Sequence, residues 1–218
     1  NNVVVTTTIK KQDLKSKQKN YIRSEKLSIE NTQVGINTAL TGMTKSTGYG
    51  LRVEDREISL NYPDVAKIIG VFESIDSNSP SLDKLTFPSG LNLDTNAILG
   101  EKVKGSNSDA IAQVTSLISA TEIEIVYLTS NKFVTGEVVN FDESIISTTL
   151  QQITEGGNLN ITNIFDLDKG QRDQFYDYSR LVRRSNFAPP TRKLLVVFDR
   201  YDVPSVSYTH LTLPTTTI

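Results

Sequence analysis

Five apolar residues in succession, from Leu194 to Phe198, constrain the fold of this chain more than any other feature. Basic residues precede the run, and Asp199 follows it directly. Side chains on a strand alternate between two faces, so an uninterrupted apolar run predicts a strand that is buried on both of them. We therefore expect residues 192–201 to form the best-buried strand of a sheet.

Two earlier segments carry strand patterns of their own. Residues 49–60 alternate apolar with charged side chains, which is typical of a half-buried antiparallel strand. The side chains expected to face inward there are Leu51, Val53, Ile58 and Leu60. Residues 65–72 predict a second strand, and residues 159–165 a third. Residues 73–95, rich in Ser, Asp, Asn and Pro, are typical of a connector. The chain as a whole is predicted to be mainly β.

The middle of the chain repeats a short motif, Gly-Glu-x-Val, at residues 100–103 and again at residues 136–139. The two copies are 36 residues apart and lie among short strand-like runs. We interpret them as two similar hairpin entries of one small β-barrel or sandwich over about residues 96–152. In this interpretation each glycine relieves a bend and each glutamate faces solvent.

The two ends of the chain differ from the rest in composition. Residues 1–48 are expected to be an irregular or β segment, with a basic arm because residues 10–26 hold seven basic and two acidic side chains. That run has no helical apolar stripe, so a solvated arm or loop is favoured over a packed helix. Residues 206–218 resemble a translated sequencing adapter, and we expect this artefactual tail to pack on nothing.

Composition excludes several functional classes. The 23 basic and 25 acidic residues give a net charge of −2, which argues against nucleic acid or an anionic membrane surface as a partner. No apolar run approaches the ~18 residues of a membrane span. The chain has no cysteine, and its one histidine is His210 in the tail. Thiolate metal sites and Ser-His-Asp or Cys-His catalysis are therefore not expected, nor is any cofactor.

Catalysis is not predicted. The sequence contains neither a Gly-x-Ser-x-Gly elbow nor a phosphate-binding Gly-x-x-x-x-Gly-Lys loop. A pair of catalytic carboxylates remains an alternative, because glycoside hydrolysis needs only two of them. The spacing from Asp166 to Asp177 partly resembles a calcium loop, but Gly170 stands at the fifth position. We interpret this stretch as a polar turn in which Gly170 supplies a positive φ.

The candidate interaction surface combines aromatic and basic side chains near the C-terminal strand. Its residues are Phe175, Tyr176, Tyr178, Arg180, Arg183, Arg184 and Arg192. The aromatic rings could stack on sugars or close a small core or an interface. The arginines could pair with carboxylates of a neighbouring subunit, or they could simply be solvated.

Two stretches resemble large β-rich virion structural proteins of marine contractile-tailed bacteriophages. One covers residues 49–65 and 70–74, and the other covers residues 170–184, with the core Gly-Gln-x-x-x-x-Tyr-Asp-Tyr, and 188–194. Residues 96–152 resemble the small β-domains inserted in such proteins. The resemblance thus implies one antiparallel β-domain made of residues 49–72 and 159–205, interrupted by the module.

The same resemblance implies a function. It points to a non-catalytic virion part of the tail or baseplate region, assembled in the host bacterial cytoplasm. The implied partners are other virion proteins and further copies of the chain in a homo-oligomer. A receptor- or glycan-binding tail module that contacts a host-surface glycan is the alternative, and a carbohydrate-degrading tail enzyme is a weaker one.

Overall fold

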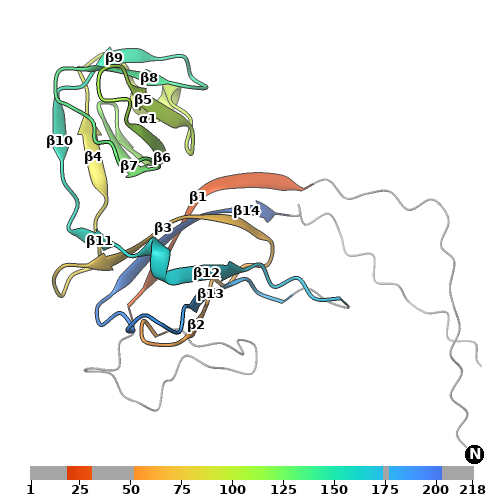
Figure 1. Ribbon diagram of the computed structural model, residues 1–218. Helices are drawn as coiled ribbons and strands as arrows, with labels where there is room; N and C mark the ends of the chain where they lie inside the picture. The colour runs from red at the N-terminus through yellow and green to blue at the C-terminus, as the bar shows by residue number, and fades with distance from the viewer. Residues whose placement is uncertain (1–18, 31–51, 174–176, 203–218) are drawn as a thin grey trace, which may run out of the picture.

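The computed structural model of the protein describes residues 19–30, 52–173 and 177–202 (Figure 1). These residues form antiparallel sheets with very little helix, so the mainly β prediction is confirmed. A four-stranded main sheet has the order β1-β14-β3-β11. Its strands are β1 (Asn20–Ile29), β14 (Leu194–Asp202), β3 (Val65–Ser74) and β11 (Asn158–Asn160).

Strand β14 lies between β1 and β3 and pairs antiparallel with both. Residues 194–199 of this strand are all buried. The five-residue apolar run therefore forms a strand with both faces covered, as its sequence predicts. The core on one face contains Leu194, Val196 and Phe198, whereas Leu195 and Val197 belong to a second cluster.

The prediction of a solvated basic arm was wrong for residues 20–26, which belong to β1. Its basic side chains are neutralised by acidic residues that are remote in sequence, because Arg23 pairs with Glu143 and Lys26 with Glu124. Such distant partners leave no local pattern. Residues 10–18 of the expected arm, and residues 1–9 and 31–48 of the N-terminal segment, lie outside the described residues.

A seven-stranded sheet with the order β10-β4-β7-β6-β5-β8-β9 forms the inserted module. Its strands are β4 (Asp83–Thr86), β5 (Lys102–Gly105), β6 (Ile111–Ser119), β7 (Glu122–Tyr127), β8 (Val138–Phe141), β9 (Ser147–Thr149) and β10 (Gln152–Thr154). The short helix α1 (Leu93–Asn96) lies between β4 and β5. The connector prediction for residues 73–95 was therefore wrong in part, because this stretch contains β4 and the start of α1. Leu85 and Phe87 alternate with polar neighbours and are fully buried, which places the stretch in the module core.

Strand β7 is buried on both faces. Ile123 and Ile125 point into the module core. Val126, on the opposite face, belongs to the cluster that contains Leu195 and Val197 of the main sheet. The module and the main sheet therefore share an apolar contact.

A three-stranded sheet completes the fold, with the strands β12 (Phe165–Asp168), β13 (Arg180–Arg183) and β2 (Glu57–Ser59). Val53, Ile58 and Leu60 are buried as expected, and Leu51 lies outside the described residues. The expected strand over residues 159–165 is instead divided between β11, the 3-10 turn η1 (Thr162–Ile164) and β12.

The pairs β3–β14 and β2–β13 join residues 57–74 to residues 180–202. The chain passes from β3 into the module at β4 and returns from β10 to β11 (Figure 1). Strand β11 pairs with the end of β3, so the two crossings lie side by side.

Among the described residues no helix is long and apolar enough to span a membrane. The tail at residues 206–218 lies outside the described residues.

Candidate functional site

The structure describes only one of the three predicted aromatic residues. Phe175 and Tyr176 lie outside the described residues. Tyr178 precedes β13 and is 38% exposed, and its backbone N–H donates to the carboxylate of Asp177 at 2.8 Å. The aromatic surface therefore stays a prediction.

Arg180 is paired within the chain. Its Nε donates to Asp168 at 2.8 Å, and its guanidinium lies 3.1 Å from the carboxylate of Glu57. The pKa of Asp168 is held well below its usual range, mainly by the hydrogen bond from Arg172. Burial would raise this pKa, but the hydrogen bonds from Arg172, the Gly170 N–H and Arg180 together outweigh it. The β12–β13 pairing places Asp168 directly opposite Arg180.

The other predicted arginines differ from one another in environment. Arg184 donates to Asp166 of β12 at 2.7 Å, and Arg183 donates to the backbone oxygen of Phe187 at 2.7 Å. Arg192 is exposed. The charges of Arg180 and Arg184 are thus balanced by carboxylates of this chain. The sequence did not reveal this pairing, because the partners lie on another strand.

The turn at Gly170 has the predicted positive φ of 71°. A Cβ at this position would lie 2.3 Å from the backbone oxygen of Asp177, so the turn requires glycine. Within the described ranges no group of three or more His, Cys, Asp or Glu side chains is placed to hold a metal ion.

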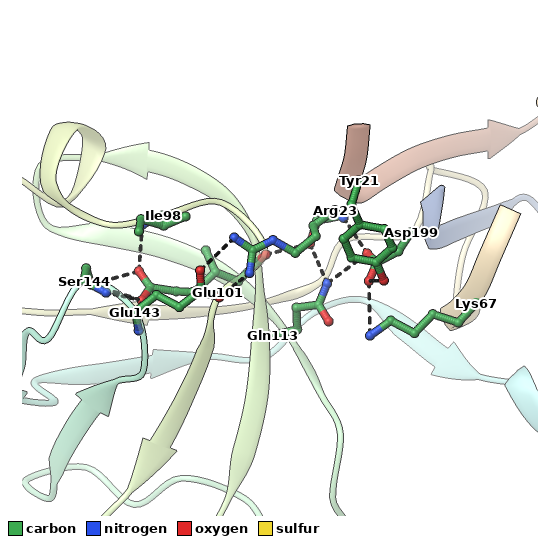
Figure 2. Close-up of polar contacts among 11 residues, drawn as sticks. Tyr21, Arg23, Lys67, Ile98, Glu101, Gln113, Glu143, Ser144 and Asp199 are labelled. Atoms are coloured by element: carbon green, nitrogen blue, oxygen red, sulfur yellow. Dashed lines mark hydrogen bonds and ion pairs between the residues drawn. The ribbon is translucent and has the colours of Figure 1, made fainter. Parts of the chain in front are cut away.

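A buried polar cluster lies between the main sheet and the module, and we call it the Asp199 bridge (Figure 2). The buried carboxylate of Asp199 accepts hydrogen bonds from the hydroxyl of Tyr21 at 2.8 Å and the backbone N–H of Ser24 at 2.9 Å. It also accepts one from Nε2 of Gln113 on β6, at 3.1 Å, and Nζ of Lys67 lies 3.1 Å away. One carboxylate therefore joins β1, β3 and β14 to the module.

A local irregularity in β1 makes this arrangement possible. The register of β1 against β14 shifts between Ile22 and Glu25, and Ser24 has a φ of 57°. Its hydroxyl consequently donates to the backbone oxygen of Val114 in β6 at 2.8 Å. The pKa of the Tyr21 hydroxyl is raised, first by burial and then by its hydrogen bond to Asp199. The bridge is a structural contact whose ionisable groups are already paired.

The two Gly-Glu-x-Val motifs form a second buried polar arrangement. Gly100 and Gly136 have φ values of 81° and 90°, as their expected bends require. The expectation that the glutamates face solvent was wrong, because Glu101 is 0% and Glu137 is 2% exposed. Both side chains turn inward because backbone N–H groups surround each carboxylate.

The carboxylate of Glu101 accepts hydrogen bonds from the backbone N–H groups of Ile98, Glu143 and Ser144, at 2.6, 3.1 and 3.0 Å (Figure 2). Ser144 adds a bond from its hydroxyl.

Glu137 repeats this arrangement with Val134, Asn107 and Ser108, at 2.7, 3.0 and 3.0 Å. Burial alone would raise the pKa of Glu137, but the backbone hydrogen bonds outweigh it and the pKa is lowered.

The backbone follows the same 36-residue offset. Gly100 N–H donates to the oxygen of Val114 at 3.0 Å, and Gly136 N–H donates to that of Leu150 at 2.8 Å. The two turns also place a residue with positive φ at the same position, Asp109 at 53° and Ile145 at 59°. Residues 98–114 and 134–150 therefore form two equivalent halves of this arrangement within the module.

The surfaces of these halves differ. Around Glu101 three of the exposed side chains are apolar, with Ile98 at 40%, Leu99 at 44% and Ile145 at 87% exposed. The equivalent residues in the other half are Val134, Thr135 and Asp109, of which only valine is apolar.

Two pockets lie away from these turns. One of about 560 Å³ lies where the module meets β11 and includes Tyr127, Lys132 and Asn160 in its lining. Nζ of Lys132 lies 3.7 Å from the centre of the Tyr127 ring. The other, of about 290 Å³, is lined by residues of β3, β12 and β13 with apolar side chains at Ile68 and Phe165.

Comparison with protein families, curated proteins and solved structures found no match to this chain.

Proposed function

We propose that this chain is a non-catalytic structural component of a bacteriophage virion, in the tail or baseplate region, and acts by assembling with other subunits. Assembly would take place in the host bacterial cytoplasm, with other virion proteins and further copies of the chain as partners. The stretches at residues 49–65, 70–74, 170–184 and 188–194 support the proposal through their resemblance to such proteins.

The Asp199 bridge is the structural observation that carries the proposal furthest. It fixes the module on the main sheet through buried hydrogen bonds, beside the apolar contact of Val126 with Leu195 and Val197. A subunit of a large assembly must present its surfaces in a constant arrangement. An enzyme or receptor that closes on a ligand would instead need a movable boundary between these two parts.

Sedimentation velocity of the purified chain over a wide concentration range tests this proposal. A structural subunit should self-associate or form a complex with a tail protein encoded beside it. The complete reading frame should also lie among capsid and tail genes. A reading frame surrounded by metabolic genes would contradict the proposal, as would release of reducing ends from host polysaccharide.

A receptor- or glycan-binding module is the second candidate, and the pocket of about 560 Å³ favours it. Tyr127 offers an aromatic ring and Asn160 an amide, which suit the apolar face and the hydroxyls of a sugar. Calorimetry with host-surface glycans tests this role. Binding that is lost in Asn160→Ala would place the ligand in this pocket, whereas loss in Tyr176→Ala would place it on the predicted aromatic surface.

A further inference from the structure

Strand β11 is an edge strand of the main sheet, and its backbone is paired on one side only (Figure 1). It pairs with β3, and the described residues contain no strand on its other side. The edge of a sheet presents unpaired N–H and C=O groups, to which a further strand can bind. This edge borders the pocket of about 560 Å³, because Asn158, Leu159 and Asn160 all line it.

The hydrogen bonds of β3 show which of its backbone groups face β11. Ser74 N–H donates to the oxygen of Lys193, on the β14 side, at 2.9 Å. Ile161 N–H, on the β11 side, donates to the oxygen of Val71 at 2.8 Å. Successive residues of an antiparallel strand point their backbone groups to opposite sides. Val71 and Glu73 therefore face β11 with their N–H and C=O groups.

The same alternation fixes the direction of the backbone groups in β11. Leu159 lies opposite Glu73, so its N–H and C=O point to β3. Those of Asn158 and Asn160 consequently point to the free edge. Within the described parts of the chain, no hydrogen-bond partner faces the backbone groups of these two asparagines. They form the alternating set of donors and acceptors to which an extended peptide binds in strand addition.

The face of β11 that points away from the module offers an apolar contact. Asn160 lies opposite Phe72, which packs against the module, so Leu159 is on the other face. Leu159 is 57% exposed and Ile75 is 58% exposed. They share this face, because a Cβ on Gly157, two residues before Leu159, would lie 3.7 Å from Ile75. An aliphatic side chain opposite Leu159 in an added strand would cover this apolar surface.

The other face of an added strand would point into the pocket. Cross-strand neighbours share a face, so residues opposite Asn158 and Asn160 would point into the pocket that Glu155 also lines. Glu155 is exposed, and no described residue forms an ion pair with it. The other carboxylate of the lining, Asp83, is already paired with Lys132 at 3.3 Å. Basic side chains therefore suit these two positions of the added strand.

The free edge is short. On one side Gly156 N–H is already bonded to Asp83 at 2.7 Å, and on the other side the turn η1 follows β11 directly. A stable contact between two folded copies needs an interface of about 1,000 Å² or more, which this edge does not supply by itself. A short extended peptide needs only the backbone hydrogen bonds and a few side-chain contacts.

We propose that the free edge of β11 is a binding site for a short extended segment of another protein, which adds to the sheet as a further strand. An aliphatic residue of the segment lies opposite Leu159, and basic residues lie on either side of it. This inference goes beyond the proposed function and does not depend on it, because it names the chemical class of a ligand.

A library of random heptapeptides, selected on the full chain, supplies the probe. The selected peptides should alternate basic and aliphatic residues, and fluorescence anisotropy measures their affinity. Asn160→Pro removes an N–H that points to the free edge, and an edge strand tolerates proline at such a position. It should weaken binding by about tenfold, because the acceptor in the peptide stays unpaired.

Asn160→Ala is the matched control, since it removes the same side chain and keeps the N–H. Its affinity should stay within about twofold of the wild type, as expected for a ligand held by the backbone. Equal binding to both variants would overturn the inference, as would a library that yields no peptide. Equal loss in both variants would mean that the ligand uses the asparagine amide, as a sugar would, and would overturn it too.

N-methylation of the peptide tests the same contact without changing the protein, and it decides the question if melting curves show that Asn160→Pro is unfolded. Only every second amide of an added strand faces β11. Methylation of one alternate set of amides should therefore abolish binding, and methylation of the other set should preserve it. Equal effects of both sets would contradict strand addition. Self-association of the wild type that a selected peptide abolishes would overturn the assignment to another protein, because the occupant would then be a second copy.

Discussion

Glu101 and Glu137 hold each other's halves of the module together. The carboxylate of Glu101, in the first half, accepts hydrogen bonds from the turn at Glu143 and Ser144 in the second half. The carboxylate of Glu137, in the second half, accepts one from the equivalent turn at Ser108 in the first half. Neither half supplies the acceptor for its own turn. The exchange makes the two halves dependent on one another, because a turn without its carboxylate would leave several polar groups unpaired.

Glu101→Gln and Glu137→Gln should each destabilise the chain by about 1–3 kcal/mol, since an amide cannot accept all the hydrogen bonds that the buried carboxylate accepts. Chemical denaturation measures the change. Glu155→Gln, at an exposed position of the module, is the control and should stay close to the wild type. Equal stability of all three variants would show that the buried carboxylates contribute nothing.

Stability should fall as the solution is acidified. The pKa of Glu137 is lowered in the folded chain, so its contribution is complete above the unfolded value of ~4.3 and is lost as the pH falls through the folded value. Asp168 acts in the same direction. Melting temperatures of the wild type should therefore decrease below about pH 4, and Glu137→Gln should show a smaller decrease. An identical decrease in both proteins would contradict the assignment.

Asp199→Asn should weaken the attachment of the module to the main sheet. The substitution removes the charge that faces Lys67 and one acceptor of the Asp199 bridge, at an expected cost of about 3 kcal/mol. Asp202→Asn is the control, because its ion pair with Arg200 is half exposed, and it should change stability by less than about 0.5 kcal/mol. The free energies of unfolding of the two variants would be compared, and a similar value for both would refute the structural role of the bridge.

Ile145→Asp should leave the monomer at least as stable as the wild type and is expected to stabilise it by up to about 1 kcal/mol. Aspartate relieves the left-handed strain, and an exposed isoleucine contributes little burial. Thermal melts at a concentration where the wild type is monomeric measure this effect. A clear loss of stability would contradict this and would mean that the Ile145 side chain supports the fold of the module.

The sequence predicted the parts of the fold that depend on local patterns. The run from Leu194 to Phe198 identified β14, and the alternation over residues 49–60 identified the buried side chains of Val53, Ile58 and Leu60, because both patterns record the burial of individual side chains. Strand β1 was missed, since the partners of Arg23 and Lys26 are more than ninety residues away.

The buried glutamates were missed for a different reason. A glutamate is usually solvated, and only its hydrogen-bond partners justify burial. One signal in the sequence could have revealed them, because Ser108 follows Glu101 by seven residues and Ser144 follows Glu137 by the same distance. The inward position of Asp199 has no such signal, since Tyr21, Lys67 and Gln113 become its neighbours only in the folded chain.

The module is attached to the main sheet at two well-separated places. The covalent crossings lie at the Ser74 end of β3 and at β11, whereas the Asp199 bridge reaches β3 only at Lys67, and the ion pairs of Arg23 and Lys26 lie on β1. A force on the module cannot swing it about the crossings without also breaking the buried hydrogen bonds of the bridge. The covalent crossings alone would act as a hinge, and the bridge removes that freedom of the module for as long as its hydrogen bonds hold.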